Sequence, residues 1–422
     1  MRKTPKILAA LAIAALSVMV VATPAFSADE NKPTVRHPSY TLLGKNPPPV
    51  DSPLNPNFIL SQESKISEGS LWHGNYISER LVGLDVADAT GDGKNELVYA
   101  TPHNVYFARM AGDVLEQLAT FEIPKSHRAL SVDFFDVNND GRHEIIISCQ
   151  LAGGGPSAYV LAYSSGQRSL QVLGSHIPWY ARVYGDARNK RLAVQKGSAM
   201  PKMAYGGDVY QATFVDGTLV SGAKIPLPFG VGVYNFNVGS LGPTQQQIVA
   251  TVTFPEEHLR LYAGGTRDDF VAQASAEYCG TVNYINLGGA KEEGRDVVYI
   301  PSRIVFADID NDGANEVIVA KNRQSGVAFM RNLRAFDGGV IEAMKFNNLS
   351  LLAFFSSANL LPGPPVDYVL ADLDNNGTKD LVAAVVIEPG SGMMNAGRSV
   401  IVSYGNLYSK PATDPNTSTA SK

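Results

Sequence analysis

The chain has 422 residues, of which 45% are hydrophobic and 18% are charged, and its formal net charge is −5. A balance this acidic offers no basic surface for nucleic acid, which excludes a nucleic-acid partner. The 39 glycines and 25 prolines favour many turns over long helices, and the length allows one large all-β domain or two smaller domains.

Residues 1–27 are typical of a cleavable signal peptide. Arg2, Lys3 and Lys6 precede an apolar run from Ile7 to Val21, and Ala25–Ser27 offers small residues where a signal peptidase cuts. The alternative is an uncleaved anchor, but the run is shorter than the ~20 residues that span a bilayer. We therefore expect an exported protein, periplasmic or extracellular, with no membrane span after signal cleavage.

The rest of the chain divides by composition into a body and two tails. Residues 28–63 form a Pro-rich N-terminal segment, and residues 409–422 form a tail rich in Pro, Thr and Ser that we expect to be disordered. The body is residues 64–408. Its Cys149 and Cys279 are too few for a disulfide framework, and a single bridge between them stays open.

The body contains four segments that align without gaps. Apolar residues two and four positions before each first Asp indicate a strand that enters the segment, and a short apolar run after it indicates a second, buried strand. The unit is therefore strand, Asp-rich loop, strand. The four segments are Asp88–Leu97, Asp136–Ile145, Asp308–Val317 and Asp372–Leu381.

Two further copies retain the second strand but have lost the carboxylates of the loop, at Arg191–Gln195 and Gln247–Val252. The six copies recur at intervals of about 47 to 69 residues, which suits one four-stranded β-propeller blade per copy. We predict an all-β propeller of six blades, with a strand from residues 64–87 closing the ring. The long interval between residues 239 and 308 leaves room for a seventh, irregular blade.

The Asp loops offer oxygen atoms at alternate positions, as a Ca²⁺ site requires, and Gly at position 6 permits the sharp turn. We expect side chains at positions 1, 3, 5 and 9 and the backbone carbonyl of position 7 to bind Ca²⁺. Thr90 makes the first loop the weakest site. The candidate ligands are Asp88, Thr90, Asp92, Lys94 and Glu96; Asp136, Asn138, Asp140, Arg142 and Glu144; Asp308, Asp310, Asp312, Ala314 and Glu316; and Asp372, Asp374, Asn376, Thr378 and Asp380.

Two other structures can contain an Asp-rich loop of this kind, an EF-hand and a plain surface turn. An EF-hand needs a bidentate Glu at position 12 and flanking helices, but position 12 is Tyr99, Ile147, Val319 or Ala383, each inside a strand-like run. Plain Asp-Gly surface turns are common. However, four copies that each crowd two or three carboxylates together would be electrostatically costly without a cation.

These loops and their flanks resemble the FG-GAP and VCBS-type repeats of bacterial exported proteins and, more distantly, the calcium loops of integrin α-chain propellers. The resemblance covers roughly residues 64–408. It implies a propeller in which the metal ions are mainly structural and ligand binding takes place elsewhere. The two copies without carboxylates and the lack of a clear FG-GAP tripeptide are departures from the pattern.

No catalytic motif stands out, and the sequence predicts a non-catalytic protein. We expect a binding or scaffolding module for a protein or glycan partner at the cell surface or in the periplasm. One alternative is a polysaccharide lyase or glycosidase with paired carboxylates in the funnel. The other is a structural component of a surface assembly. The aromatic cluster Trp179, Tyr180 and Tyr184 is either packing between blades or a platform for sugars.

Overall fold

The computed structural model describes residues 71–200, 202–242, 244–287, 297–325, 334–346, 350–357, 361–388 and 397–405. The chain divides into two compact units, Met1–Pro49 and Val50–Lys422, and all described residues belong to the second. The expected signal peptide (1–27), Pro-rich segment (28–63) and C-terminal tail (409–422) lie outside the described residues. Among the described residues, no helix is long and apolar enough to cross a membrane.

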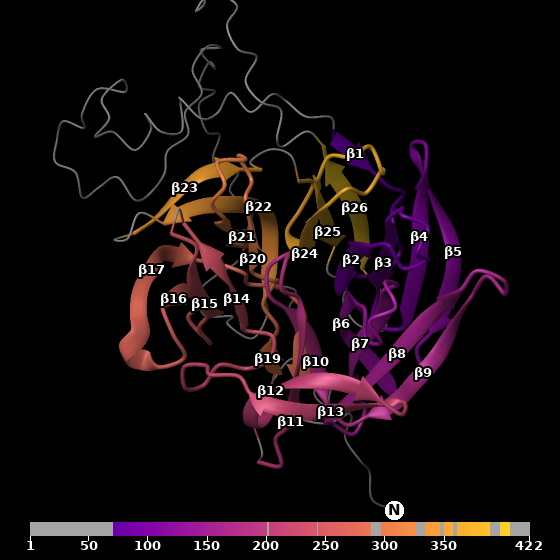
Figure 1. Ribbon diagram of the computed structural model, residues 1–422, viewed down its shortest axis with the longest axis horizontal. Coiled ribbons are helices and arrows are strands. Elements are labelled where there is room, and N and C mark those ends of the chain that lie inside the picture. The colour runs from indigo at the N-terminus through magenta and orange to yellow at the C-terminus, as the bar shows by residue number, and fades with distance from the viewer. Residues whose placement is uncertain are drawn as a thin grey trace, which may run out of the picture. The chain divides into compact units, whose positions relative to one another are not determined.

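The described chain forms six four-stranded antiparallel sheets arranged as the blades of a propeller (Figure 1). Blade 1 contains β2 (Gly83–Ala87), β3 (Glu96–Ala100), β4 (Asn104–Ala111) and β5 (Val114–Glu122). Blade 2 contains β6 (His127–Phe135), β7 (Glu144–Leu151), β8 (Pro156–Ser164) and β9 (Ser169–Ile177). Blade 3 contains β10 (Tyr180–Tyr184), β11 (Arg191–Gly197), β12 (Tyr205–Val215) and β13 (Thr218–Lys224).

The second half of the ring repeats this order. Blade 4 contains β14 (Phe236–Leu241), β15 (Gln246–Val252), β16 (His258–Tyr262) and β17 (Phe270–Glu277), with a short 3-10 helix at Arg267–Asp269 before its last strand. Blade 5 contains β20 (Val305–Ala307), β21 (Glu316–Ser325), β22 (Ala335–Phe346) and β23 (Leu351–Ser356). Blade 6 contains β24 (Pro365–Ala371), β25 (Asp380–Glu388), β26 (Arg398–Tyr404) and β1 (Leu71–His73).

The ring is closed by β1, the first described strand of the chain. It pairs with β26 in the register Leu71 to Tyr404 and His73 to Val402, so the two ends of the described chain share one sheet. This confirms the predicted closing strand. Pairing across the ends removes an edge on which another chain could add a strand.

The blades are held together by apolar side chains between neighbouring sheets. All five residues of β3 are buried, as expected of a strand covered on both faces, whereas the outer strand β13 buries only one of its seven residues. Between blades 1 and 2, the rings of Phe107 and Phe134 meet edge to face with centroids 6.3 Å apart. The core therefore lies between the blades, near the inner strands.

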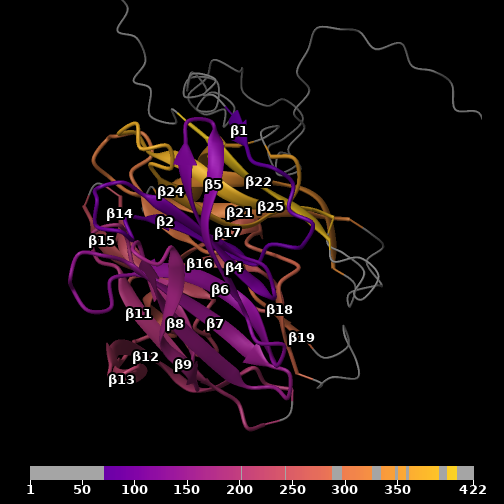
Figure 2. The same ribbon diagram turned by 90° about the vertical axis from the view of Figure 1, so that its right-hand side faces the viewer.

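In the long interval after blade 4, the described residues form a two-stranded hairpin and no seventh four-stranded blade. Its strands are β18 (Tyr284–Asn286) and β19 (Val297–Tyr299), which lie to the right of β6 and β7 in Figure 2. The hairpin contacts blade 2, since the Asn286 N–H donates to Gln150 Oε1 at 2.9 Å and Asn283 Nδ2 donates to the Leu130 carbonyl at 2.6 Å. Ile285 and Ile300 pack in a cluster with Tyr180 and Tyr234 from blades 3 and 4.

Candidate metal centres

All four Asp loops connect the innermost strand of a blade to the second strand, in blades 1, 2, 5 and 6. The candidate ligand at position 9 is in each case the first residue of the second strand: Glu96 of β3, Glu144 of β7, Glu316 of β21 and Asp380 of β25. Position 12 lies inside that strand, as the exclusion of an EF-hand requires. The two copies without carboxylates are the corresponding second strands of blades 3 and 4, β11 and β15.

The loops share one backbone conformation. The first Asp of each loop accepts a hydrogen bond from the N–H of the position 6 Gly, at 2.8 or 2.9 Å. The residue at position 5 likewise accepts from the N–H of position 7, at 2.8 to 3.0 Å. The side-chain oxygens therefore hold the loop in a tight coil even before any ion is considered.

Positive φ angles explain the Gly at position 6 and a feature that the sequence analysis missed. The four Gly have φ between +81° and +88°, which a residue with a Cβ adopts only with strain. Position 4 is also left-handed, at Gly91, Asn139, Asn311 and Asn375. Asn tolerates this conformation better than other residues that have a Cβ, so Asn or Gly at position 4 is part of the motif.

The carboxylates at position 9 are buried, with exposed fractions of 0% for Glu96, 4% for Glu144, 1% for Glu316 and 3% for Asp380. The three Glu each accept a hydrogen bond from the N–H of position 2, at 2.9 or 3.0 Å. The Asp380 carboxylate likewise accepts from the Leu373 N–H and from Ser403, but its Oδ1 has no hydrogen-bond partner among the described residues. A buried polar atom without a partner is rare and costly, which makes this oxygen a candidate for an ion.

Burial and crowding also raise the pKa of these acids. The pKa of Glu316 is raised to about 8, first by burial and then by Asp310 and Asp312, although the Ile309 N–H and Lys345 oppose the shift. The pKa of Asp380 is raised to about 6, again first by burial and then by Asp374. A divalent cation would relieve both causes, because it compensates the desolvated charge and the repulsion between carboxylates.

Two basic side chains that no local sequence pattern marks reach into the loops. Arg109 of β4 contacts Asp92 and Glu96 in the first loop, and Lys345 of β22 contacts Asp310 and Asp312 in the loop of blade 5. Among the described residues, Asp308, Asp310 and Glu316 place carboxylate oxygens within 4.8 Å of one another. Lys345 thus contacts Asp310, a member of this closely spaced group of carboxylates.

The loop of blade 6 opens onto a cavity of roughly 700 Å³, which gives an ion access to its oxygens. Asp374, Asn376 and Asp380 line the cavity together with Trp72 and Gly405. The Trp72 indole donates to the Asp113 carbonyl at 2.8 Å, so this aromatic ring is held against blade 1.

Side chains at position 8 link neighbouring loops. Asn95 donates to the Asp372 carbonyl at 2.8 Å, His143 Nδ1 to the Asp88 carbonyl at 2.8 Å, and Asn315 to the Ser240 carbonyl at 3.0 Å. In each case the partner belongs to the adjacent blade. Asn95 therefore joins loop 1 to the loop of blade 6, and His143 joins loop 2 to loop 1.

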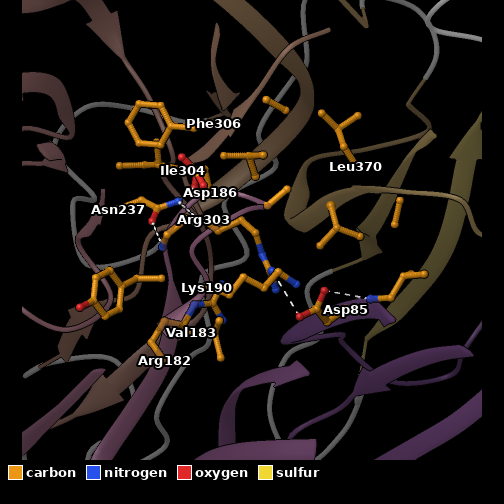
Figure 3. A pocket seen from close by; sticks show the side chains of 18 of the residues that line it. Asp85, Arg182, Val183, Asp186, Lys190, Asn237, Arg303, Ile304, Phe306 and Leu370 are labelled. Atoms are coloured by element: carbon orange, nitrogen blue, oxygen red, sulfur yellow. Dashed lines mark hydrogen bonds and ion pairs between the residues drawn. The ribbon is translucent and has the colours of Figure 1, made fainter. Parts of the chain in front are cut away.

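The funnel at the loop end of the ring contains a second polar group that the sequence did not reveal. Arg303 Nε lies 2.6 Å from Asp367 Oδ1, Nη2 lies 3.3 Å from Asp133, and Nη1 lies 3.9 Å from Asp85. Figure 3 shows Arg303 reaching toward Asp85 within the cavity, which has a volume of roughly 110 Å³. Burial opposes the charge of Arg303, but Asp367 and the other acids hold its pKa above the usual value.

Most of the aromatic cluster and both cysteines are buried in the core. Tyr180 and Tyr184 are 1% and 5% exposed, so these two rings belong to the packing between blades, while Trp179 is half-buried and its ring lies 5.3 Å from Lys196 Nζ. Cys149 and Cys279 are both buried and both free, so no bridge joins them. Buried thiols of this kind act as small apolar side chains.

Comparison with known proteins matches one segment of the chain to a family. Residues 88–147 match the model of the FG-GAP-like repeat. This segment begins at the first Asp of loop 1 and ends in the strand that follows loop 2. A solved structure named glucose dehydrogenase is similar at 9% identity and a TM-score of 0.41, covering 80% of this chain and 99% of that chain. No curated protein gives a match.

The matched segment and the ring support the same assignment. The segment contains two Asp loops, the same loop recurs in blades 5 and 6, and the sheets form a six-bladed ring. The chain is therefore a six-bladed β-propeller that contains an FG-GAP-like repeat at residues 88–147.

Proposed function

We propose that this chain is an exported calcium-binding propeller in which Ca²⁺ braces the Asp loops and the ring serves as a binding or scaffolding module for a protein or glycan. The observation that carries the calcium proposal is Oδ1 of Asp380, which is buried, lacks a hydrogen-bond partner in the described part of the chain and shares its loop with Asp372 and Asp374. An ion in this loop would supply the missing partner and offset the repulsion between the three acids.

The donor set fits calcium better than a transition metal. The candidate ligands are carboxylate, amide, hydroxyl and carbonyl oxygens, and Ca²⁺ takes six to eight oxygens in flexible geometry. No His or Cys lies among the candidate ligands, whereas zinc and copper sites use those residues. The bound ion would supply positive charge between two strands of one blade. The Gly and Asn residues at positions 6 and 4 would keep the loop backbone in the conformation that presents its oxygens to the ion.

A binding role is favoured over a catalytic role by the funnel. A polysaccharide-active enzyme would need free paired carboxylates there. The three buried acids of the funnel instead contact Arg303, and Arg182 also lies 3.4 Å from both Asp133 and Asp367. The cavity of roughly 110 Å³ is also smaller than the ~300–1,000 Å³ of ordinary small-molecule sites. A glycan array and a pull-down from envelope extract, both without a ligand, would remove the support for this role.

The calcium proposal is tested by thermal unfolding with chelator and with added Ca²⁺. We expect EGTA to lower the melting temperature and excess calcium to restore it, since one ion at 100 times its Kd stabilises the fold by about 2.7 kcal/mol. Asp372→Asn should reduce this response. Asp216→Asn, in the Asp-Gly turn between β12 and β13, is the matched control and should keep it. Equal melting curves for the wild type in EGTA and in calcium would refute the proposal.

A further inference from the structure

The first Asp loop already contains a cation, which is the guanidinium of Arg109. Nε of Arg109 donates to Glu96 Oε1 at 2.6 Å, and Nη2 donates to Asp92 Oδ2 at 2.8 Å and to Thr90 Oγ1 at 3.0 Å. These groups are positions 9, 5 and 3, which are three of the five proposed ligands. A guanidinium that donates several hydrogen bonds to carboxylates is among the strongest polar contacts in proteins.

The strand register shows that Arg109 occupies a position that recurs in the other blades. In blade 1, Leu97 at loop position 10 pairs with Ala108, and Arg109 follows it. In blade 2, Ile145 pairs with Leu161, so the equivalent residue is Ala162. In blade 6, Leu381 pairs with Tyr404, so the equivalent residue is Gly405. Neither replacement carries a charge that could enter the loop.

Blade 5 has Lys345 at this position, because Val317 pairs with Met344. The surroundings of Lys345 nevertheless differ from those of Arg109. Position 3 is Asp310 in blade 5 but Thr90 in blade 1, so the blade 5 loop has one more carboxylate than the first loop. The net charge of the blade 5 ligands together with Lys345 therefore equals that of the ligands in blades 2 and 6, which have no basic residue at this position. The first loop together with Arg109 is less negative. An ammonium on a flexible stem is also displaced more easily than a guanidinium fork.

We propose that Arg109 takes the place of the ion in loop 88–96, so that this loop is sealed without calcium while the loops at 136–144, 308–316 and 372–380 bind it. The inference rests on the calcium role proposed above. It assigns to Asp92 and Glu96 a salt bridge that joins the loop to β4 in place of a metal site. The neutral Thr90 at position 3 and the positive Arg109 both make this loop less negative, so both lower its attraction for a second cation.

Equilibrium dialysis against Ca²⁺ alone, followed by elemental analysis, tests the proposal. The wild type should retain about three ions per chain. Arg109→Ala and Arg109→Gln should each retain about four, since both free the carboxylates of the first loop. The converse variant places the same cation in blade 2, and Ala162→Arg should retain about two. Arg168→Gln, an exposed arginine of the β8–β9 turn, is the control and should retain the wild-type number.

The outcomes separate this inference from the calcium proposal. A wild type that retains no ion would refute calcium binding itself. A wild type that retains four ions, unchanged by Arg109→Gln, would overturn the inference and leave calcium binding intact. If the Arg109 variants do not fold, Ala162→Arg decides, because retention of all wild-type ions by the folded variant would equally overturn it.

Discussion

At the scale of single residues, the Asp loops separate the residues that shape the backbone from those that carry charge. Gly at position 6 and Asn or Gly at position 4 adopt positive φ, and these two residues turn the chain back on itself. The first Asp then accepts the N–H groups that the turn brings together. The acid at position 9 is buried beneath the loop, where its charge is unfavourable until a cation compensates for it.

The raised pKa values predict how calcium and pH act together. Burial and then Asp374 raise the pKa of Asp380 to about 6, and burial and then Asp310 raise that of Glu316 to about 8. An acid whose pKa is higher in the folded state costs stability as pH rises past its unfolded value, and calcium removes that cost by replacing the proton. We therefore expect the rise in melting temperature caused by saturating calcium to grow between about pH 5 and about pH 8.

This measurement should use metal-free protein in chelator-free buffer, because the affinity of a chelator itself changes with pH. Glu316→Gln should flatten the upper part of the profile while Asp380 still contributes the lower part. A calcium-induced rise that is the same at every pH would contradict the prediction.

At the scale of strands, the ring depends on the short strand β1. It forms three residue pairs with β26, and Trp72 adds an indole hydrogen bond to Asp113 of blade 1. The two ends of the described chain thus close the ring without covalent linkage. Without β1, the edge of β26 would be left with unpaired N–H and C=O groups.

A chain that begins after His73 should therefore be less stable than one that begins at residue 64. We expect a loss of about 2–4 kcal/mol, from hydrogen bonds that each contribute roughly 0.5–1.5 kcal/mol net. Urea unfolding measures the loss, and size-exclusion chromatography should show association of the shortened chain through its open edge. Matching stability of the two chains would argue against a closing role for β1.

The strands and loops that could be predicted from the sequence are those specified by residues close together in the chain. Each strand–loop–strand unit is specified by a short run of residues, which explains why four loops, two degraded copies and the closing strand were all identifiable. The role of Arg109 was not predictable, because the stretch that separates a loop from the third strand differs in length from blade to blade. Only the register of β3 with β4 shows which residue faces the loop.

At the scale of the whole molecule, an ionic group joins blades that are distant in sequence. Arg303 precedes blade 5 and contacts Asp85 of blade 1, Asp133 of blade 2 and Asp367 of blade 6. It also donates to the Leu84 carbonyl at 2.7 Å. No local pattern marks these residues, since each acid lies inside an apolar strand, and their pairing follows only from closure of the ring.

Removal of Arg303 should consequently destabilise the fold strongly. Arg303→Met leaves buried acids short of a counter-charge, and breaking a buried ion pair in this way costs about 3–5 kcal/mol. Arg168→Met is the control, because Arg168 and Glu116 are 66% and 54% exposed and such surface pairs contribute roughly 0–1 kcal/mol. Guanidinium chloride unfolding of both variants checks the difference, and equal losses would disprove the role of Arg303.

The stretch of chain that contains the hairpin of β18 and β19 has a consequence for how the blades stay together. Asn283 bonds to Leu130 of blade 2, and Ile285 lies in a cluster with Tyr180 of blade 3. Arg303, further along the same stretch, bridges blades 1, 2 and 6. These contacts do not involve the Asp loops, so loss of the proposed ions would leave them in place.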